Sequence, residues 1–191
     1  MELCAPWQAA VVTEFEALAE SVANGTGWLL GSFATLDGAG VVDIDFARHG
    51  VNVWVVGPDK FGTWREGRVQ LDRAPSSGPW MAGDSSTSTW DGWAEVAETR
   101  PAGTWPDGGP VLGLTFESGS GSFPSRAFSS VRGVAAQGVV AVEFGFGGRV
   151  RRRAVDSPTG GFILTVPARA VDRSPTVRVV YADGDIVDVN R

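Results

Sequence analysis

Apolar positions recur at helical spacing only near the start of the chain. Between residues 6 and 24 they are three or four residues apart, which places them on one face of a helix. These positions are Trp7, Val11, Phe15, Leu18 and Val22. Pro6 suits a first helical turn, and Asn24 followed by Gly25 is typical of a helix end. We therefore predict one amphipathic helix over residues 6–24.

After this segment the pattern changes to an alternation of apolar and polar residues. Val42, Ile44 and Phe46 alternate with Asp43 and Asp45, as expected for a strand with one buried face. Short runs of this kind continue to residue 72 and are separated by short turns, most of which contain glycine. Because such turns cannot join parallel strands, residues 1–73 are predicted to form a helix on an antiparallel β-meander.

The pattern is interrupted once and then resumes. Residues 74–89 lack periodicity and are rich in Ser, Thr, Pro and Gly, so they are predicted to be a linker or long loop. Alternating segments follow, with glycine turns at residues 147–148 and 183–185. Several short strands spaced by turns predict an antiparallel β-sandwich over residues 90–191. The fold class is mainly β (α+β), and whether the two β regions are one domain or two stays open.

The last third of the chain is similar to a group of small sandwich modules. Val139 and Val142 stand in one predicted strand, with a turn at residues 147–148. Val166 and Pro167 close a later strand, and the segment VRVVYADGD ends the pattern. In this order, the chain over residues 133–189 resembles bacterial immunoglobulin-like or carboxypeptidase-regulatory-like β-sandwich accessory domains. The resemblance implies adhesion, packing or positioning without catalytic residues, and it does not cover residues 1–132.

Composition supports the β assignment and limits the partners. The chain has 26 glycines and 8 tryptophans among 191 residues, and glycine at this density favours turns between short strands over long helices. A net charge of -6 disfavours nucleic acid as a partner. No segment reaches the roughly 20 apolar residues that span a bilayer, so no membrane insertion is expected.

The sequence gives few signals for the cellular compartment or for a cofactor or metal. The first residues, MELCAPWQ, lack the basic region of a signal peptide, so a cytoplasmic protein is slightly favoured over a trimmed extracytoplasmic domain. Cys4 is the only cysteine and cannot form an intramolecular disulfide, which does not decide the compartment. We expect no cofactor and no metal, and the oligomeric state stays open.

Two carboxylates and the only histidine lie close together in the sequence. Asp43 and Asp45 are two residues apart in a strand and therefore on one face. There they could share a hard cation or act with His49 as base and acid. The simpler interpretation, which we prefer, is a solvated strand face that ends in a turn. A hydrolase that uses these three residues is kept as a second alternative function.

Two shorter motifs are better explained as loops and turns. Residues 83–85, Gly-Asp-Ser, are similar to the nucleophile segment of chymotrypsin-like proteases, but Ser86 and Thr87 stand where glycines should follow. The Asp-Gly-Asp sequence at residues 183–185 is similar to part of a calcium loop but lacks further ligands at the required spacing. No catalytic residue is assigned, and an enzyme is the less favoured class.

Arginines form the most basic segment of the chain. Arg149, Arg151 and Arg153 alternate along one predicted strand face, about 7 Å apart, and could contact a phosphate, a sulfate or an acidic partner. A cationic edge strand that prevents sheet-to-sheet aggregation explains the same pattern and is preferred.

Tryptophans crowd the middle of the chain, around its least regular segments. Such residues either fill a core or present indole rings to a sugar or a protein. The candidate ligand or partner-binding residues are Trp80, Trp90, Trp93 and Trp105. We therefore expect a noncatalytic interaction or structural module that presents a Trp-bearing loop surface to a protein partner. A carbohydrate-binding module is the first alternative.

Overall fold

The computed structural model describes residues 40–47, 50–58, 61–73, 80–89, 100–120, 127–157, 159–167 and 174–189. Within them the chain forms eleven β-strands, all paired antiparallel, so the mainly β class is confirmed. The strands belong to two compact units, unit 1 (Met1–Ala94) and unit 2 (Glu95–Arg191). The helix predicted over residues 6–24 lies outside the described residues. In the described part of the chain, no helix has the length and apolar character needed to cross a membrane.

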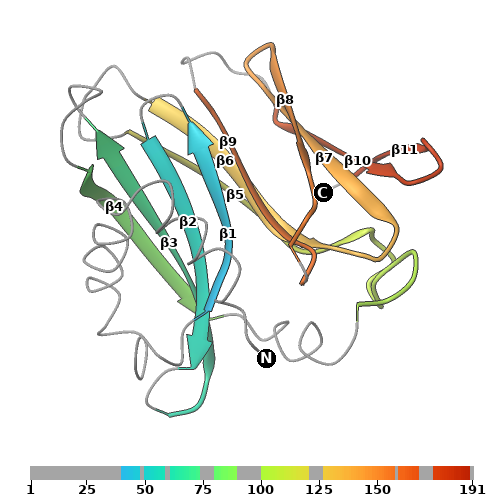
Figure 1. Cartoon of the computed structure of the whole chain (residues 1–191), viewed down its shortest axis with the longest axis horizontal. Coiled ribbons are helices and arrows are strands. Elements are labelled where there is room, and N and C mark those ends of the chain that lie inside the picture. The colour runs from blue at the N-terminus through green and yellow to red at the C-terminus, as the bar shows by residue number, and fades with distance from the viewer. Residues whose placement is uncertain are drawn as a thin grey trace. The chain divides into compact units, whose positions relative to one another are not determined.

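Unit 1 contains a four-stranded antiparallel meander (Figure 1). Its strands lie in the order β1-β2-β3-β4, with the bounds β1 (Gly40–Ala47), β2 (Gly50–Pro58), β3 (Trp64–Arg73) and β4 (Trp80–Thr89). One face carries buried aliphatic side chains, which include Val42, Ile44, Val51, Val53 and Val55. The meander predicted from the alternation is thus present.

The fourth strand lies where the sequence predicts a linker. Residues 80–89 pair with β3 from Arg65↔Thr89 to Arg73↔Trp80. β4 has no hydrophobic alternation, because most of its residues are Ser, Thr and Gly. Its strand conformation comes from backbone pairing at the edge of the sheet, which a hydrophobic pattern does not report. The boundary between the two units in the chain accordingly falls after residue 94, and β4 belongs to unit 1.

Unit 2 is built from two antiparallel sheets. The first has the order β5-β6-β9 and contains β5 (Val111–Ser120), β6 (Ala127–Ala135) and β9 (Gly161–Pro167). The second has the order β11-β10-β7-β8 and contains β7 (Val139–Phe146), β8 (Arg149–Ala154), β10 (Thr176–Tyr181) and β11 (Ile186–Asp188).

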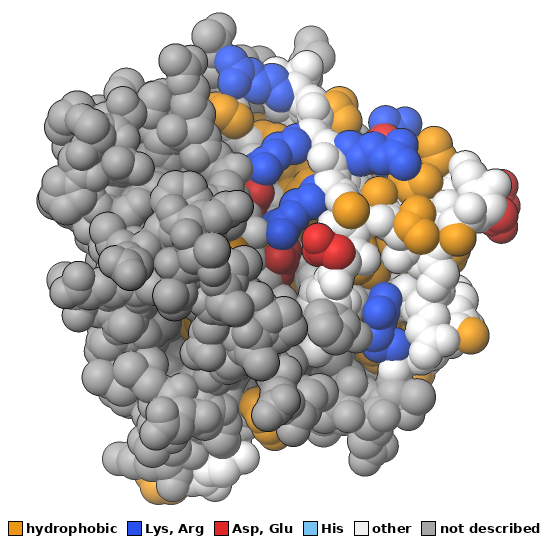
Figure 2. Space-filling model, in the orientation of Figure 1, with side chains coloured by type: hydrophobic (Ala, Val, Ile, Leu, Met, Phe, Trp, Pro, Cys, Tyr) orange, Lys and Arg blue, Asp and Glu red, His pale blue; other side chains and the backbone are white. Residues whose placement is uncertain are grey.

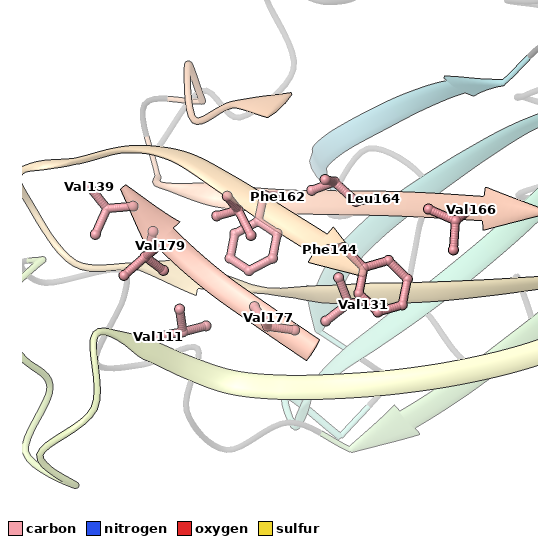
Figure 3. Close-up of a cluster of buried hydrophobic side chains, with 11 residues drawn as sticks. Val111, Val131, Val139, Phe144, Phe162, Leu164, Val166, Val177 and Val179 are labelled. Atoms are coloured by element: carbon pink, nitrogen blue, oxygen red, sulfur yellow. The ribbon is translucent and has the colours of Figure 1, made fainter. Parts of the chain in front are cut away.

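Both sheets of unit 2 contribute side chains to one hydrophobic core (Figure 3). Phe144 on β7 lies in this core, and its ring centroid is 6.2 Å from that of Phe116 on β5. The other buried members are Val111, Val131, Ala135, Val139, Val142, Phe162, Leu164, Val166, Val177 and Val179. The two sheets are therefore two layers around a shared core.

β6 lies between β5 and β9, yet the hydrophobic pattern does not predict it. Ser129, Ser130 and Arg132 interrupt the alternation, and all three side chains are buried. The Arg132 guanidinium pairs with the carboxylate of Glu117 on β5 at 2.7 Å. A buried charge is tolerated when it is paired in this way. The partner that makes this strand possible stands on another strand and cannot be seen in the β6 sequence itself.

The loop that precedes β5 is held against the end of β6. Arg100 donates hydrogen bonds from Nε to the carbonyl of Ala135 (2.9 Å) and from a terminal nitrogen to that of Ala136 (3.0 Å). Burial lowers the pKa of the Arg100 guanidinium from its usual value. Gly160 has a φ of +73°, and a Cβ there would lie 2.6 Å from the Ala135 carbonyl oxygen. Glycine is therefore required for the close approach at this corner.

Candidate functional site

Polar residues of unit 1 share the sheet face opposite the aliphatic one. Asp45 on β1 lies opposite Asn52 on β2, and Asn52 lies opposite Gln70 on β3. In the neighbouring row, Trp54 lies opposite both Asp43 and Arg68. Residues directly opposite each other in an antiparallel pair share a face. The sheet thus brings the two predicted aspartates together with residues from two further strands.

Glu66 connects three strands through hydrogen bonds on this face. Its Oε2 accepts a hydrogen bond from the indole Nε1 of Trp54 on β2 at 3.1 Å. Its Oε1 accepts one from the hydroxyl of Ser88 on β4 at 2.8 Å. One row away, Arg68 donates to Oδ1 of Asn52 at 3.0 Å. These bonds tie β2, β3 and β4 together at the level of their side chains.

This face is buried, contrary to the prediction of a solvated face for Asp43 and Asp45. Asp45 is 1% exposed, and Asn52, Glu66, Arg68 and Gln70 are also buried. Asp43 is half-buried, and its Oδ1 accepts a hydrogen bond from the backbone nitrogen of Ile44 at 2.8 Å. Alternation shows which residues share a face but not whether that face is covered, which explains the difference.

The face does not assemble the predicted hydrolase site within the described residues. His49 lies outside them, so its position relative to the aspartates stays a prediction. Among the described residues, no group of three His, Cys, Asp or Glu could hold a metal ion. The spacing of two between Glu66, Arg68 and Gln70 is the sequence signal for this network. Gly67 within this spacing favours a turn when the sequence is considered alone, whereas β3 continues through it in the structure.

The arginines of β8 bridge the two sheets of unit 2 at their open side. Arg151 donates from a terminal nitrogen to the carbonyl of Thr165 at 2.9 Å, and Arg153 donates to the carbonyl of Ile163 at 3.0 Å. Both carbonyls belong to β9, which pairs only with β6 among the described strands. The guanidiniums of Arg151 and Arg153 therefore cover edge carbonyls of β9, and the predicted protection of the β8 edge itself stays a prediction. Arg149, the third predicted anion contact, is exposed.

The other side of β8 belongs to a row of charges on the outward face of its sheet. Arg152 lies 3.6 Å from the carboxylate of Glu143, and Arg178 on β10 lies 2.7 Å from the same carboxylate. Asp188 on β11 is directly opposite Arg178. In Figure 2, arginine side chains lie among hydrophobic and acidic ones on this part of the surface.

The predicted tryptophan surface is only partly described. Trp105, one of the candidate binding residues, is 2% exposed, and its indole donates to the carbonyl of Val134 at 3.1 Å, so it fills the core instead. Trp80 is the first residue of β4, but the structure does not describe its side chain. Trp90 and Trp93 lie outside the described residues. Trp54 is buried and Trp64 is half-buried. Trp54, Trp64 and Trp105 therefore form no exposed platform for a sugar.

The two shorter motifs have ordinary structural roles. Residues 83–85 lie within β4, in the register that pairs Asp84 with Gln70. At residues 183–185, the backbone nitrogen of Asp185 donates to Oδ1 of Asp183 at 3.0 Å, and Gly184 has a φ of +95°. The latter motif is thus the predicted hairpin turn between β10 and β11.

Comparisons with protein-family models, curated proteins and solved structures find no match to this chain. The contacts described above are therefore the basis for a functional interpretation.

Proposed function

We propose that this chain is a noncatalytic interaction module, and that unit 2 is an immunoglobulin-like sandwich that presents its four-stranded sheet to a protein partner. The strand order supports the architecture. The first, second and fifth strands of unit 2 form one sheet, and the seventh, sixth, third and fourth form the other. This is the order of immunoglobulin-like sandwiches that carry an additional strand beside the third.

One observation carries the proposal: large apolar side chains are exposed on the edge strands of this sheet. Val150 on β8 is 63% exposed, and Ile186 on β11 is 52% exposed. The charged groups of the interior, by contrast, are engaged in structural contacts, as Glu66 and Arg132 show. Exposed apolar groups beside charges are typical of interaction surfaces.

An edge strand offers a specific way to bind a protein. β8 can take up an extended segment of a partner as an additional strand, with backbone hydrogen bonds for affinity and side-chain contacts for selectivity. The cationic side chains of β8 favour an acidic segment. Trp80, Trp90 and Trp93 stay candidates for further contacts with the partner, because tryptophans are clustered in this part of the sequence.

Peptide binding tests this function. The probe is a peptide with the alternating core Val-Thr-Glu-Thr-Val, and the control peptide has Lys in place of Glu. We expect the Glu peptide alone to shift the backbone amide NMR resonances of β8 in the full chain. No response of β8 to either peptide would contradict the proposal, and equal responses to both would remove its charge selectivity.

A further inference from the structure

The two edges of the four-stranded sheet in unit 2 match each other in side chains, charge and strand direction. Two rows of residues cross this sheet on the face opposite the core of unit 2, and Ala141 and Val180 in the second row are buried. The first row is Arg152, Glu143, Arg178 and Asp188, and the second is Ala154, Ala141, Val180 and Ile186. In the first row the charges alternate from strand to strand, beginning with a cation at one edge and ending with an anion at the other.

At both edges of the sheet, the residues of these rows direct their backbone N–H and C=O groups away from the neighbouring strand. Directly after β8, the nitrogen of Val155 donates to the carbonyl of Val140 on β7 at 2.9 Å. Since hydrogen-bonding direction alternates along a strand, the backbone groups of Arg152 and Ala154 point away from β7. Directly after β11, the nitrogen of Val189 donates to the carbonyl of Val177 on β10 at 2.8 Å, so the backbone groups of Ile186 and Asp188 point away from β10.

Strand direction at the two edges is also compatible. Each strand in the order β11-β10-β7-β8 is antiparallel to its neighbour, so β8 runs antiparallel to β11. Consider a second copy that is shifted across the strands, past the β8 edge of the first copy. Its β11 would then lie beside β8 of the first copy and run antiparallel to it. Arg152 would then face Asp188 of the next copy, and Ala154 would face its Ile186. The alternation of charge would continue across the junction without interruption.

We infer that this protein associates head to tail with further copies of itself, by addition of β11 of one copy to β8 of the next. This inference rests on the proposed function and names its partner as a second copy of the chain. Charge complementarity selects this partner, because β11 with the adjoining turn carries Asp183, Asp185 and Asp188, whereas β8 is arginine-rich and carries Arg152 on the face of the junction. Burial of Ile186 against the neighbouring copy would remove apolar surface from water. The paired surfaces differ, so the contact does not close as a two-fold dimer and extends to a ring or a filament of more than two copies.

Sedimentation equilibrium of the full chain tests the inference. At low salt the weight-average mass should rise with concentration beyond that of two chains, and high salt should reduce it because exposed charges are screened. R152E and D188R should each remain monomeric, because each places like charges opposite one another at the junction. A mixture of R152E and D188R should associate again, because each variant then supplies the charge that the other one needs.

Two further variants separate association from folding. Ala154→Pro removes one outward backbone donor but no hydrogen bond to β7, so it should also prevent association. Asp107→Arg makes the same charge change as D188R in the exposed loop before β5 and should associate like the wild type. A wild-type mass that stays at one chain or stops at two, or R152E that associates like the wild type, would overturn the inference. Binding of the acidic peptide without self-association would leave the proposed function intact.

Discussion

Glu66 illustrates, at the scale of a single residue, how a charged group can serve the fold. Its two carboxylate oxygens accept hydrogen bonds from side chains on the two neighbouring strands, and the residue is buried. A buried carboxylate is costly unless such bonds compensate for lost hydration. The same geometry makes Glu66 a better candidate for a structural role than for a catalytic one.

Replacement of this carboxylate measures its structural role. Glu66→Ala removes the acceptor for both Trp54 and Ser88 and should lower the free energy of unfolding by about 1–3 kcal/mol. Ser88→Ala is the matched control, since it removes one of these bonds at an exposed residue and should cost less. Urea denaturation with fluorescence detection compares the variants. If Glu66→Ala were as stable as the wild type, the polar face would be the better candidate for a ligand site.

At the scale of the elements, β8 has a different function on each of its sides. Arg151 and Arg153 reach from β8 to carbonyls of β9 and close the open side of unit 2. Arg152 instead takes part in the charge row of the outward face. Because side chains alternate along a strand, one arginine-rich segment can therefore protect the edge of β9 and still present a cationic edge of its own.

Removal of the bridging arginines tests the first of these functions. The double variant R151A/R153A loses two charge-assisted hydrogen bonds and should lower the free energy of unfolding of unit 2 by about 1–3 kcal/mol, given their partial exposure. Arg149→Ala, at an exposed position of the same strand, should change it by less than about 0.5 kcal/mol. Hydrogen exchange of the β9 amides provides the measurement. Equal protection in both variants would favour anion contact over the bridging role.

At the scale of the whole molecule, two compact units each have their own strands. Unit 2 has a core to which both of its sheets contribute, and Phe144 is among its largest fully buried side chains. The charge of the molecule is also unevenly distributed, because the chain has a net charge of -6 but carries the arginine-rich edge strand β8. Such asymmetry favours association with acidic surfaces, including that of another copy.

The shared core predicts the effect of a cavity. Phe144→Ala should lower the free energy of unfolding of unit 2 by about 3–5 kcal/mol, since it removes a fully buried aromatic ring. Val150→Ala, on the exposed edge, is the control and should have an effect below about 0.5 kcal/mol. Exchange protection of amides in β7, β9 and β10 reports unit 2 separately, which one optical transition of a chain with two units does not. Unchanged protection would show that these sheets do not depend on this core.

Local features of the fold were determined by the sequence alone. Residues 139–146 alternate as a strand and are β7, and the glycine pair that follows forms the predicted turn, with φ values of +59° and +79°. The turn at residues 183–185 was equally predictable. In each case the information lies within a few consecutive residues, because glycine tolerates a backbone conformation that other residues rarely adopt.

The tertiary structure alone decided which strands are neighbours and which polar residues are covered. β4 and β6 depend on backbone pairs and on a partner such as Glu117, and neither is visible in the hydrophobic pattern of their own residues. The burial of Asp45 and Trp105 likewise depends on segments distant in the chain. Pairing and burial are properties of several segments together, whereas periodicity describes one segment at a time. For the same reason, the complementary charges of Arg152 and Asp188 lie in one row only through the order of the strands between them.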